Sequence, residues 1–228
     1  MPRTAVVLLA AGSGSRVGAE VNKVLLPLLG RAVLTWSLQG VAGLRYVEQV
    51  AVVHRPEDAR DVAPLVATWS RGARLVEGGP TRHASEWNAL RELGPSIDAG
   101  DLDVVAIHDT ARPLAGRGLY DAVVSAAAEH GGAIPVRDLP GLLPSDPGAG
   151  PTGALVAVQT PQAFRAADLL AAYRAADADG FEGTDTAACV ERYTEVVIRA
   201  VPSPATNIKI TFSEDVALAQ RLLGPAGI

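Results

Sequence analysis

Residues 4–18 read TAVVLLAAGSGSRVG, a short apolar run that ends in a glycine-rich turn. Aliphatic and β-branched side chains in a run of this length are typical of a buried strand. Glycines that follow a first strand let backbone N–H groups come close to a phosphate or a base edge. The stretch therefore predicts a first strand, Ala5–Leu9, that carries a ligand-binding loop at its carboxyl end.

Strands and helices alternate through the rest of the 228 residues. Further strands are expected at Val50–Val53, Ala73–Val76, Val104–Ile107, Ala133–Val136, Val196–Val201 and Ile208–Phe212, and helices at Val33–Leu44, Glu57–Trp69, Arg82–Leu93, Leu119–His130, Arg165–Ala176 and Asp185–Arg192. This spacing predicts a single α/β domain over residues 1–228, a Rossmann-like three-layer α/β/α sandwich with a mostly parallel sheet. Ligands are then expected at the carboxyl ends of the strands.

Residues 137–153 break this alternation, because prolines and glycines recur at short intervals and exclude a regular helix. A strand-like stretch, Ala154–Val158, follows directly. We therefore predict an excursion over residues 137–158, and both an ordered protruding arm and a surface loop are open interpretations of it.

Composition excludes several classes of protein. The formal net charge is −5, and no basic stripe is present that could follow a nucleic acid backbone. No apolar run approaches the roughly 18 residues of a membrane span, so we expect a cytoplasmic protein without membrane or nucleic acid partners. The single cysteine, Cys189, excludes an intramolecular disulfide and is expected to pack in the core.

Lysine is rare in this chain: Lys23 and Lys209 stand against eighteen arginines. Both lie in segments that resemble phosphate sites, where a compact ammonium fits better than a planar guanidinium. Chance retention at exposed positions is the alternative. The turn itself lacks the third glycine of the dinucleotide fingerprint, where Val17 stands, and lacks the Gly-Lys-Ser/Thr of a Walker loop. Its two cations, Arg16 and Lys23, suit a triphosphate.

The loop LAAGSGSR, followed by Lys23, resembles the signature loop of the 2-C-methyl-D-erythritol 4-phosphate cytidylyltransferase family. Six more segments resemble family motifs in the same order: GGPTRHAS (78–85), VAIHDTARP (105–113), PVRD (135–138), QTPQ (159–162), TD (184–185) and NIKIT (207–211). The resemblance covers nearly the whole chain. It implies small-molecule substrates and a homodimer in which the 137–158 arm reaches over the partner.

The resemblance also implies residue roles. Nucleotide binding falls to Ala10, Ala11, Gly12, Ser13, Gly14, Gly79, Arg82, Ser85 and Thr110, and the catalytic residues are Arg16, Lys23 and Lys209. The acceptor is assigned to Asp109, Arg112, Asp138, Thr160, Thr184 and Lys209. Asp109 follows an apolar strand, so we expect it to bind Mg²⁺ or a substrate hydroxyl; a helix N-cap is the competing interpretation.

The reaction implied is attack of a phosphate monoester on the α-phosphorus of CTP, with release of pyrophosphate and Mg²⁺ as cofactor. Two positions depart from the family: Leu139 stands where the family has Thr, and Thr152 where its arm carries Arg, a cation that Arg137 is a candidate to supply. The open interpretations are the methylerythritol phosphate enzyme, a paralogue acting on ribitol 5-phosphate or a phosphonate, and a nucleotide-binding protein without turnover. A fourth interpretation, a dinucleotide oxidoreductase, is weakened by the absent third glycine.

Overall fold

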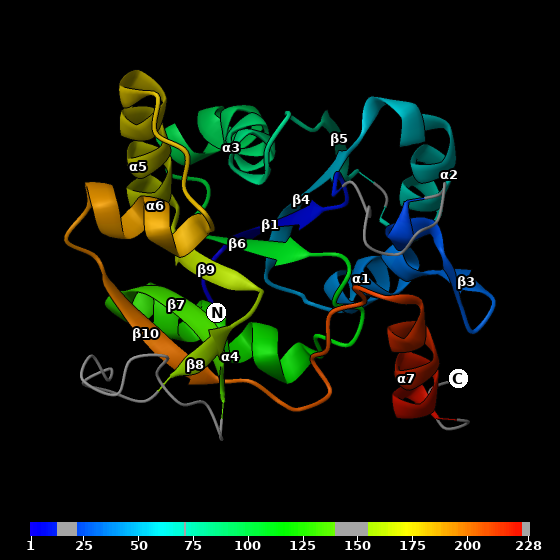
Figure 1. Ribbon diagram of the computed structural model, residues 1–228. Coiled ribbons are helices and arrows are strands. Elements are labelled where there is room, and N and C mark those ends of the chain that lie inside the picture. The colour runs from blue at the N-terminus through cyan, green and yellow to red at the C-terminus, as the bar shows by residue number, and fades with distance from the viewer. Residues whose placement is uncertain (13–21, 71, 140–154, 225–228) are drawn as a thin grey trace.

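The computed structural model describes residues 1–12, 22–70, 72–139 and 155–224, and its centre is one twisted sheet (Figure 1). The strands run in the order β5-β4-β1-β6-β9-β7-β10, with β8 paired to β7. Their bounds are β1 Thr4–Leu9, β4 Val47–His54, β5 Arg74–Glu77, β6 Val104–Asp109, β7 Gly131–Asp138, β8 Val156–Val158, β9 Gln162–Arg165 and β10 Val197–Pro202.

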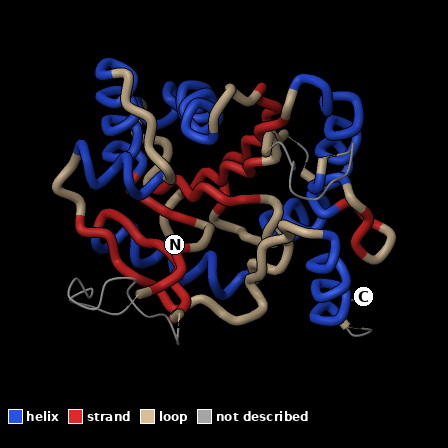
Figure 2. Tube along the Cα trace, viewed as in Figure 1, coloured by secondary structure: helices blue, strands red, loops and turns tan. Residues whose placement is uncertain are grey.

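Helices cover both faces of the sheet, as the tube view makes plain (Figure 2). One face packs against α1 (Val33–Ala42), α2 (Ala59–Trp69) and α4 (Arg117–His130). The other packs against α3 (Arg82–Asp98), α5 (Ala166–Asp179) and α6 (Thr186–Tyr193). Side chains alternate along β1, so Val6 and Leu8 enter the first core while Ala5 and Val7 enter the second. The predicted three-layer sandwich is confirmed.

The parallel strands β5, β4, β1 and β6 all end at the same edge of the sheet. Smaller elements lie beside that edge: the short helix η2 (Lys23–Leu25), the hairpin of β2 (Pro27–Leu28) and β3 (Arg31–Ala32), the turn η3 (Pro56–Asp58) and α7 (Ser213–Leu223). Within the described ranges no helix is long and apolar enough to cross a membrane.

One predicted strand is absent from the described residues, and one strand of the main sheet was not predicted. Residues 208–212 pair with no strand, and the N–H of Ile210 donates instead to the carbonyl of Ala111 in the loop after β6. Gln162–Arg165 was not predicted, yet it forms β9, antiparallel to both β6 and β7. The predicted excursion is described only at its ends, where β7 and β8 pair as an antiparallel ribbon; residues 140–154 lie outside the described residues.

Candidate functional site

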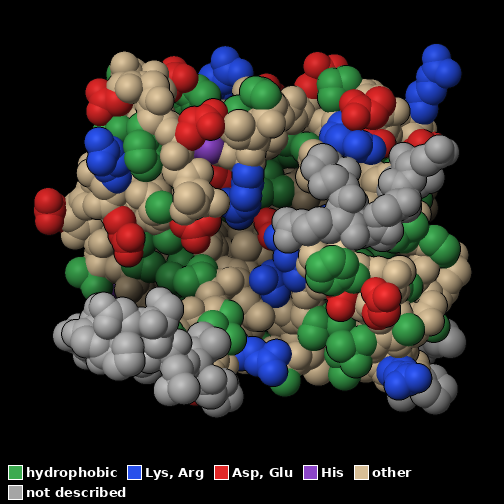
Figure 3. Space-filling view, viewed as in Figure 1, with side chains coloured by type: hydrophobic (Ala, Val, Ile, Leu, Met, Phe, Trp, Pro, Cys, Tyr) green, Lys and Arg blue, Asp and Glu red, His purple; other side chains and the backbone are tan. Residues whose placement is uncertain are grey.

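A pocket of about 290 Å³ opens at the carboxyl edge of the parallel strands. It is lined by Leu9, Ala11, Gly12, Lys23, Val24, Gly79, Pro80, Thr81, Arg82, Ser85, Asp109, Ala111 and Lys209. Lysine and arginine side chains border the hollow in the middle of the face shown in Figure 3. Four segments that are far apart in sequence thus meet where the sheet topology predicts a ligand site.

Glycine brings two of these segments into contact. A Cβ on Gly78 would lie 2.6 Å from the Cβ of Ala11, and a Cβ on Gly79 would lie 2.5 Å from the Cβ of Ala84. Both distances are shorter than van der Waals contact allows. Gly78 therefore lets the loop after β5 reach the loop after β1, and Gly79 lets the same loop turn closely onto the start of α3. Ser85 holds the turn by accepting from the N–H of Gly79 at 3.1 Å.

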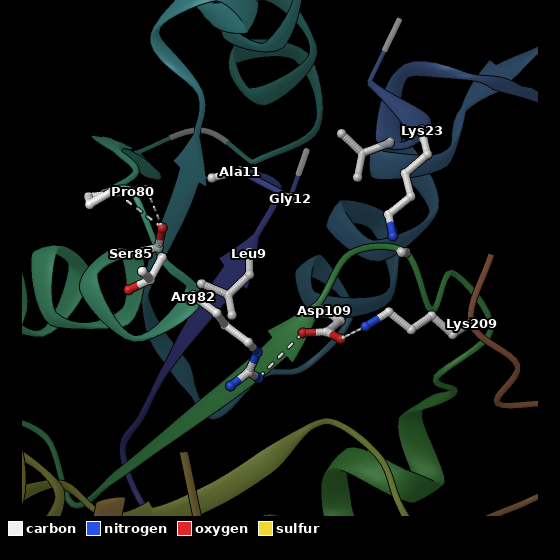
Figure 4. Close-up of a pocket in the computed structure, with 13 residues that line it drawn as sticks. Leu9, Ala11, Gly12, Lys23, Pro80, Arg82, Ser85, Asp109 and Lys209 are labelled. Atoms are coloured by element: carbon white, nitrogen blue, oxygen red, sulfur yellow. Dashed lines mark hydrogen bonds and ion pairs between the residues drawn. The ribbon is translucent and has the colours of Figure 1, made fainter. Parts of the chain in front are cut away.

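Arg82 occupies the first turn of α3, where Thr81 is the N-cap and accepts from the N–H of Ala84. A helix N-terminus is unfavourable for a cation unless anions are near. Two carboxylates supply that charge: Nη1 lies 2.5 Å from Oε1 of Glu86, and Nη2 lies 3.4 Å from Oδ1 of Asp109. The guanidinium is therefore held between the buried carboxylate of Glu86 and Asp109 in the pocket, and its contact with Asp109 is shown in Figure 4.

Asp109 ends β6 and carries its charge in the middle of the pocket. Its Oδ2 accepts from Nζ of Lys209 at 2.6 Å, and its side chain is 14% exposed. Burial alone would raise the pKa of Asp109, but Arg82 and Lys209 outweigh burial and hold that pKa well below its usual range. The next helix begins only at Arg117, so Asp109 is not a helix N-cap.

The HDTARP segment is fixed by a buried hydrogen-bond relay. The N–H of Asp109 donates to Oγ1 of Thr160, and that hydroxyl lies 3.2 Å from Nδ1 of His108. Nε2 of His108 faces the carbonyl of Arg112, an acceptor, so the ring carries its proton on Nε2 and accepts from Thr160. Thr160 and His108 thus set the backbone position of Asp109.

Lys209 reaches the pocket because its segment docks on the same loop. Asn207 donates through Nδ2 to the carbonyl of Thr160 and accepts on its own carbonyl from Nη1 of Arg112 at 2.8 Å. Arg112 is buried and does not line the pocket. Its visible role is to hold the segment that presents Lys209.

Lys23 enters the pocket from the opposite side to Ser85 (Figure 4). It begins η2, which Asn22 caps by accepting from the N–H of Val24. Nδ2 of Asn22 also donates to the carbonyl of Ala10 and to Asp58, so one buried side chain ties both ends of the glycine-rich loop together.

The remaining predicted residues lie in several places. Ala10 and Thr110 are fully buried beneath the pocket, and Oγ1 of Thr110 donates to the carbonyl of Leu9. Asp138 and Thr184 are exposed and do not line the pocket. Ser13, Gly14, Arg16 and Thr152 lie outside the described residues.

Residues that the sequence did not single out include Glu86, Asn22 and His108. Each is polar, buried and close in sequence to a motif residue. That closeness is the one sequence feature by which they could have been found. Cys189 is buried in the core, where burial raises the pKa of its thiol to about 12 and removes it as a nucleophile.

The buried histidine leads to a prediction about pH. Burial lowers the pKa of His108 to about 4, below the roughly 6.5 of an unfolded chain. The unfolded state therefore takes up a proton first, and the stabilisation that is fully present above about pH 6.5 is lost as the pH falls towards 4. In EDTA, we expect the free energy of unfolding to fall between pH 7.5 and 4 by about 3 kcal/mol more in the parent than in His108→Gln.

Urea unfolding at several pH values measures this difference. His130→Gln is the matched control, because His130 lies at the end of α4, away from the relay. Equal pH dependence in the parent and in His108→Gln would contradict the neutral, buried ring.

Similarity to known proteins extends over nearly the whole chain. Residues 4–225 match the family model described as IspD, 2-C-methyl-D-erythritol 4-phosphate cytidylyltransferase. Proteins of that name from Synechococcus sp. (strain JA-3-3Ab) and Thermosynechococcus vestitus are 35% and 36% identical, over 94% and 96% of this chain and 94% of each relative.

Solved structures agree with the sequence relatives. The 4-diphosphocytidyl-2C-methyl-D-erythritol synthase from Anaerococcus prevotii superposes with a TM-score of 0.82 at 25% identity, covering 97% of this chain and 96% of that one. The cytidylyltransferase from Thermus thermophilus gives a TM-score of 0.72 at 31% identity, covering 97% and 98%. With its motifs gathered around one pocket and its relatives matched from end to end, this chain belongs to the 2-C-methyl-D-erythritol 4-phosphate cytidylyltransferase family.

Proposed function

We propose that this protein transfers CMP from CTP to the phosphate of 2-C-methyl-D-erythritol 4-phosphate and releases pyrophosphate, a step in isoprenoid precursor synthesis. Membership of the family supports the reaction. The observation that carries it is the charge set of Arg82, Asp109 and Lys209 in one pocket beside Lys23. We place the reaction in the cytoplasm, where CTP is available.

The chemistry asks for alignment and charge neutralisation. A monoester oxygen of the acceptor attacks the α-phosphorus of CTP, a new P–O bond forms, and the bond to the β-phosphate oxygen breaks with its electron pair leaving on pyrophosphate. The second pKa of a phosphate monoester is about 6, so the nucleophile is already largely a dianion at neutral pH and needs no protein base.

The pocket cations divide this work. Arg82 sits at the N-terminus of α3, beside the Gly79 turn, and we assign it to the triphosphate. Lys23, with Arg16 from the same loop, neutralises charge that grows on the α-phosphate and the leaving group. Lys209 orients the nucleophilic phosphate. Arg112 supports Lys209 from below through Asn207.

Asp109 is a suitable ligand for Mg²⁺. Mg²⁺ is usually held by one or two carboxylates together with nucleotide phosphates, so a single acid suffices. No cluster of three or more acids, histidines or cysteines able to hold a metal occurs among the residues described. Asp109 is ionised and faces the pocket, and a triphosphate can take over the two cations that now neutralise it. A bound Mg²⁺ would offset phosphate charge.

A homodimer completes the proposal. Leu139, Leu155, Val156 and Val158, at the described ends of the arm, are each 37–47% exposed, and exposed apolar side chains at this density favour a protein contact. We expect light scattering to give twice the mass of one chain. An active monomer would contradict a role for the partner's arm at the acceptor site.

Pyrophosphate release with CTP and Mg²⁺ tests the function, with methylerythritol 4-phosphate, ribitol 5-phosphate and small phosphonates as acceptors. Turnover with the first supports the proposal and makes Leu139 a tolerated variation at the end of β7. Turnover only with another acceptor would make Leu139 and Thr152 determinants of specificity. CTP binding without turnover on any acceptor would point to a binding protein instead.

A further inference from the structure

The carboxylate of Glu86 is fully buried, and no step of the proposed reaction uses it. It lies on α3 one turn after Arg82 and does not line the pocket. Its Oε2 accepts from the hydroxyl of Tyr173, its Oε1 accepts from Oγ1 of Thr186 at 2.8 Å, and Oε1 lies 2.5 Å from Nη1 of Arg82.

Burying a carboxylate in such a place costs desolvation free energy. Burial raises the pKa of Glu86 above its ordinary value, and Arg82, Tyr173 and Thr186 limit that rise. Its neighbours on the buried side of α3, among them Ala89, Leu90 and Leu93, are apolar, so packing alone would be served by an apolar side chain. The polar partners of Glu86 come from three helices: Arg82 from α3, Tyr173 from α5 and Thr186 from α6. Together they form a polar site around one acid.

The acid acts on a single pocket residue. Nη1 of Arg82 contacts Glu86 and Nη2 contacts Asp109, and the side chain is 29% exposed. Without the pull of Glu86, the guanidinium would be free to move onto Asp109, which already accepts from Lys209. That move would neutralise the pocket's carboxylate and draw the arginine away from the nucleotide side.

We propose that Glu86 is a positioning residue that holds the guanidinium of Arg82 towards the triphosphate, with Tyr173 and Thr186 fixing Glu86 in turn. The inference deepens the proposed function and depends on Arg82 contacting a nucleotide. Nothing in it requires a particular acceptor, so it is testable by CTP binding alone.

Glu86→Gln keeps the size of the side chain and removes its charge. We expect it to raise the KM for CTP, and the Kd for CTP measured by calorimetry, about 10-fold, while kcat changes less than about 3-fold. In an Arg82→Ala background the same substitution should add less than about 2-fold, because its target is gone. Glu92→Gln, on the exposed side of α3, is the matched control and should change neither constant.

Independent, multiplicative losses from Glu86→Gln and Arg82→Ala would overturn the proposal, as would an unchanged Kd in Glu86→Gln. If Glu86→Gln fails to fold, Tyr173→Phe and Thr186→Val carry the test, with about 3-fold rises in Kd that also vanish in the Arg82→Ala background. Absence of pyrophosphate release by the parent would count against the proposed function, while CTP calorimetry would still decide the role of Glu86.

Discussion

Replacing Lys23 by alanine is expected to lower kcat about 100- to 1,000-fold while changing the KM for CTP less than about 5-fold. The side chain lines the pocket from the side opposite Ser85. A preorganised cation acts most strongly on charge that develops in the transition state, so its loss appears in turnover and not in ground-state binding. Steady-state pyrophosphate release at varied CTP separates the two constants.

Lys23→Arg is the sharper version of the same test, and we expect it to lose nearly as much turnover as the alanine variant. The residue starts a short helix whose cap, Asn22, is buried and tied to Ala10 and Asp58, so the backbone has little room to retreat. A forked guanidinium is wider than the ammonium that the pocket accommodates. Arg60→Lys, at an exposed position of α2, is the control for exchange between these residues. Parental turnover in Lys23→Arg would instead favour chance retention of the lysine.

The sheet was predictable because its strands are short apolar runs separated by helices of crossover length. One error is β9, at the antiparallel side of the sheet, and the other is residues 208–212, beside the loop after β6. β9 contributes only Gln162–Arg165 and begins in a motif rich in polar residues, so it gave no apolar run. Ile208–Phe212 has the alternation of a strand, but its backbone N–H groups donate to the loop after β6, to Thr206 and to the side chain of Asp215, and not to a strand. Sequence pattern reports which residues are buried and does not report which backbone they pair with.

The pocket was predictable to a similar degree. Motifs that follow parallel strands must meet at one edge, so Ala11, Gly79, Asp109 and Lys23 were expected together and do line one pocket. Burial of polar motif residues was not predictable. Thr110 donates its hydroxyl to the backbone carbonyl of Leu9, and Arg112 donates to the backbone carbonyl of Asn207, so both side chains bind protein backbone. Glu86 could not be found because its partners, Tyr173 and Thr186, follow about ninety to a hundred residues later.

Asp109→Asn is expected to lower kcat/KM about 1,000-fold and to weaken the dependence of turnover on Mg²⁺. Asp109 is the only acid among the described residues that line the pocket. Asparagine keeps the shape of the side chain and removes both its charge and its strength as a ligand for a hard cation. Initial rates at a series of Mg²⁺ concentrations measure both effects, and Asp121→Asn, on α4, is the control.

The same variant should bind CTP more tightly when no metal is present, and this opposite sign identifies the role of the carboxylate. In the parent, Asp109 neutralises Lys209 at 2.6 Å and faces Arg82 at 3.4 Å, so it competes with the triphosphate for both cations. Removing its charge leaves Lys209 without this counter-ion and Arg82 paired with Glu86 alone, so calorimetry in EDTA should register a several-fold lower Kd for CTP. Tighter binding with lost turnover fits a carboxylate that serves the metal and the transition state. Tighter binding with turnover and Mg²⁺ dependence both preserved would reduce Asp109 to a counter-ion for Lys209 and would move the metal to another group.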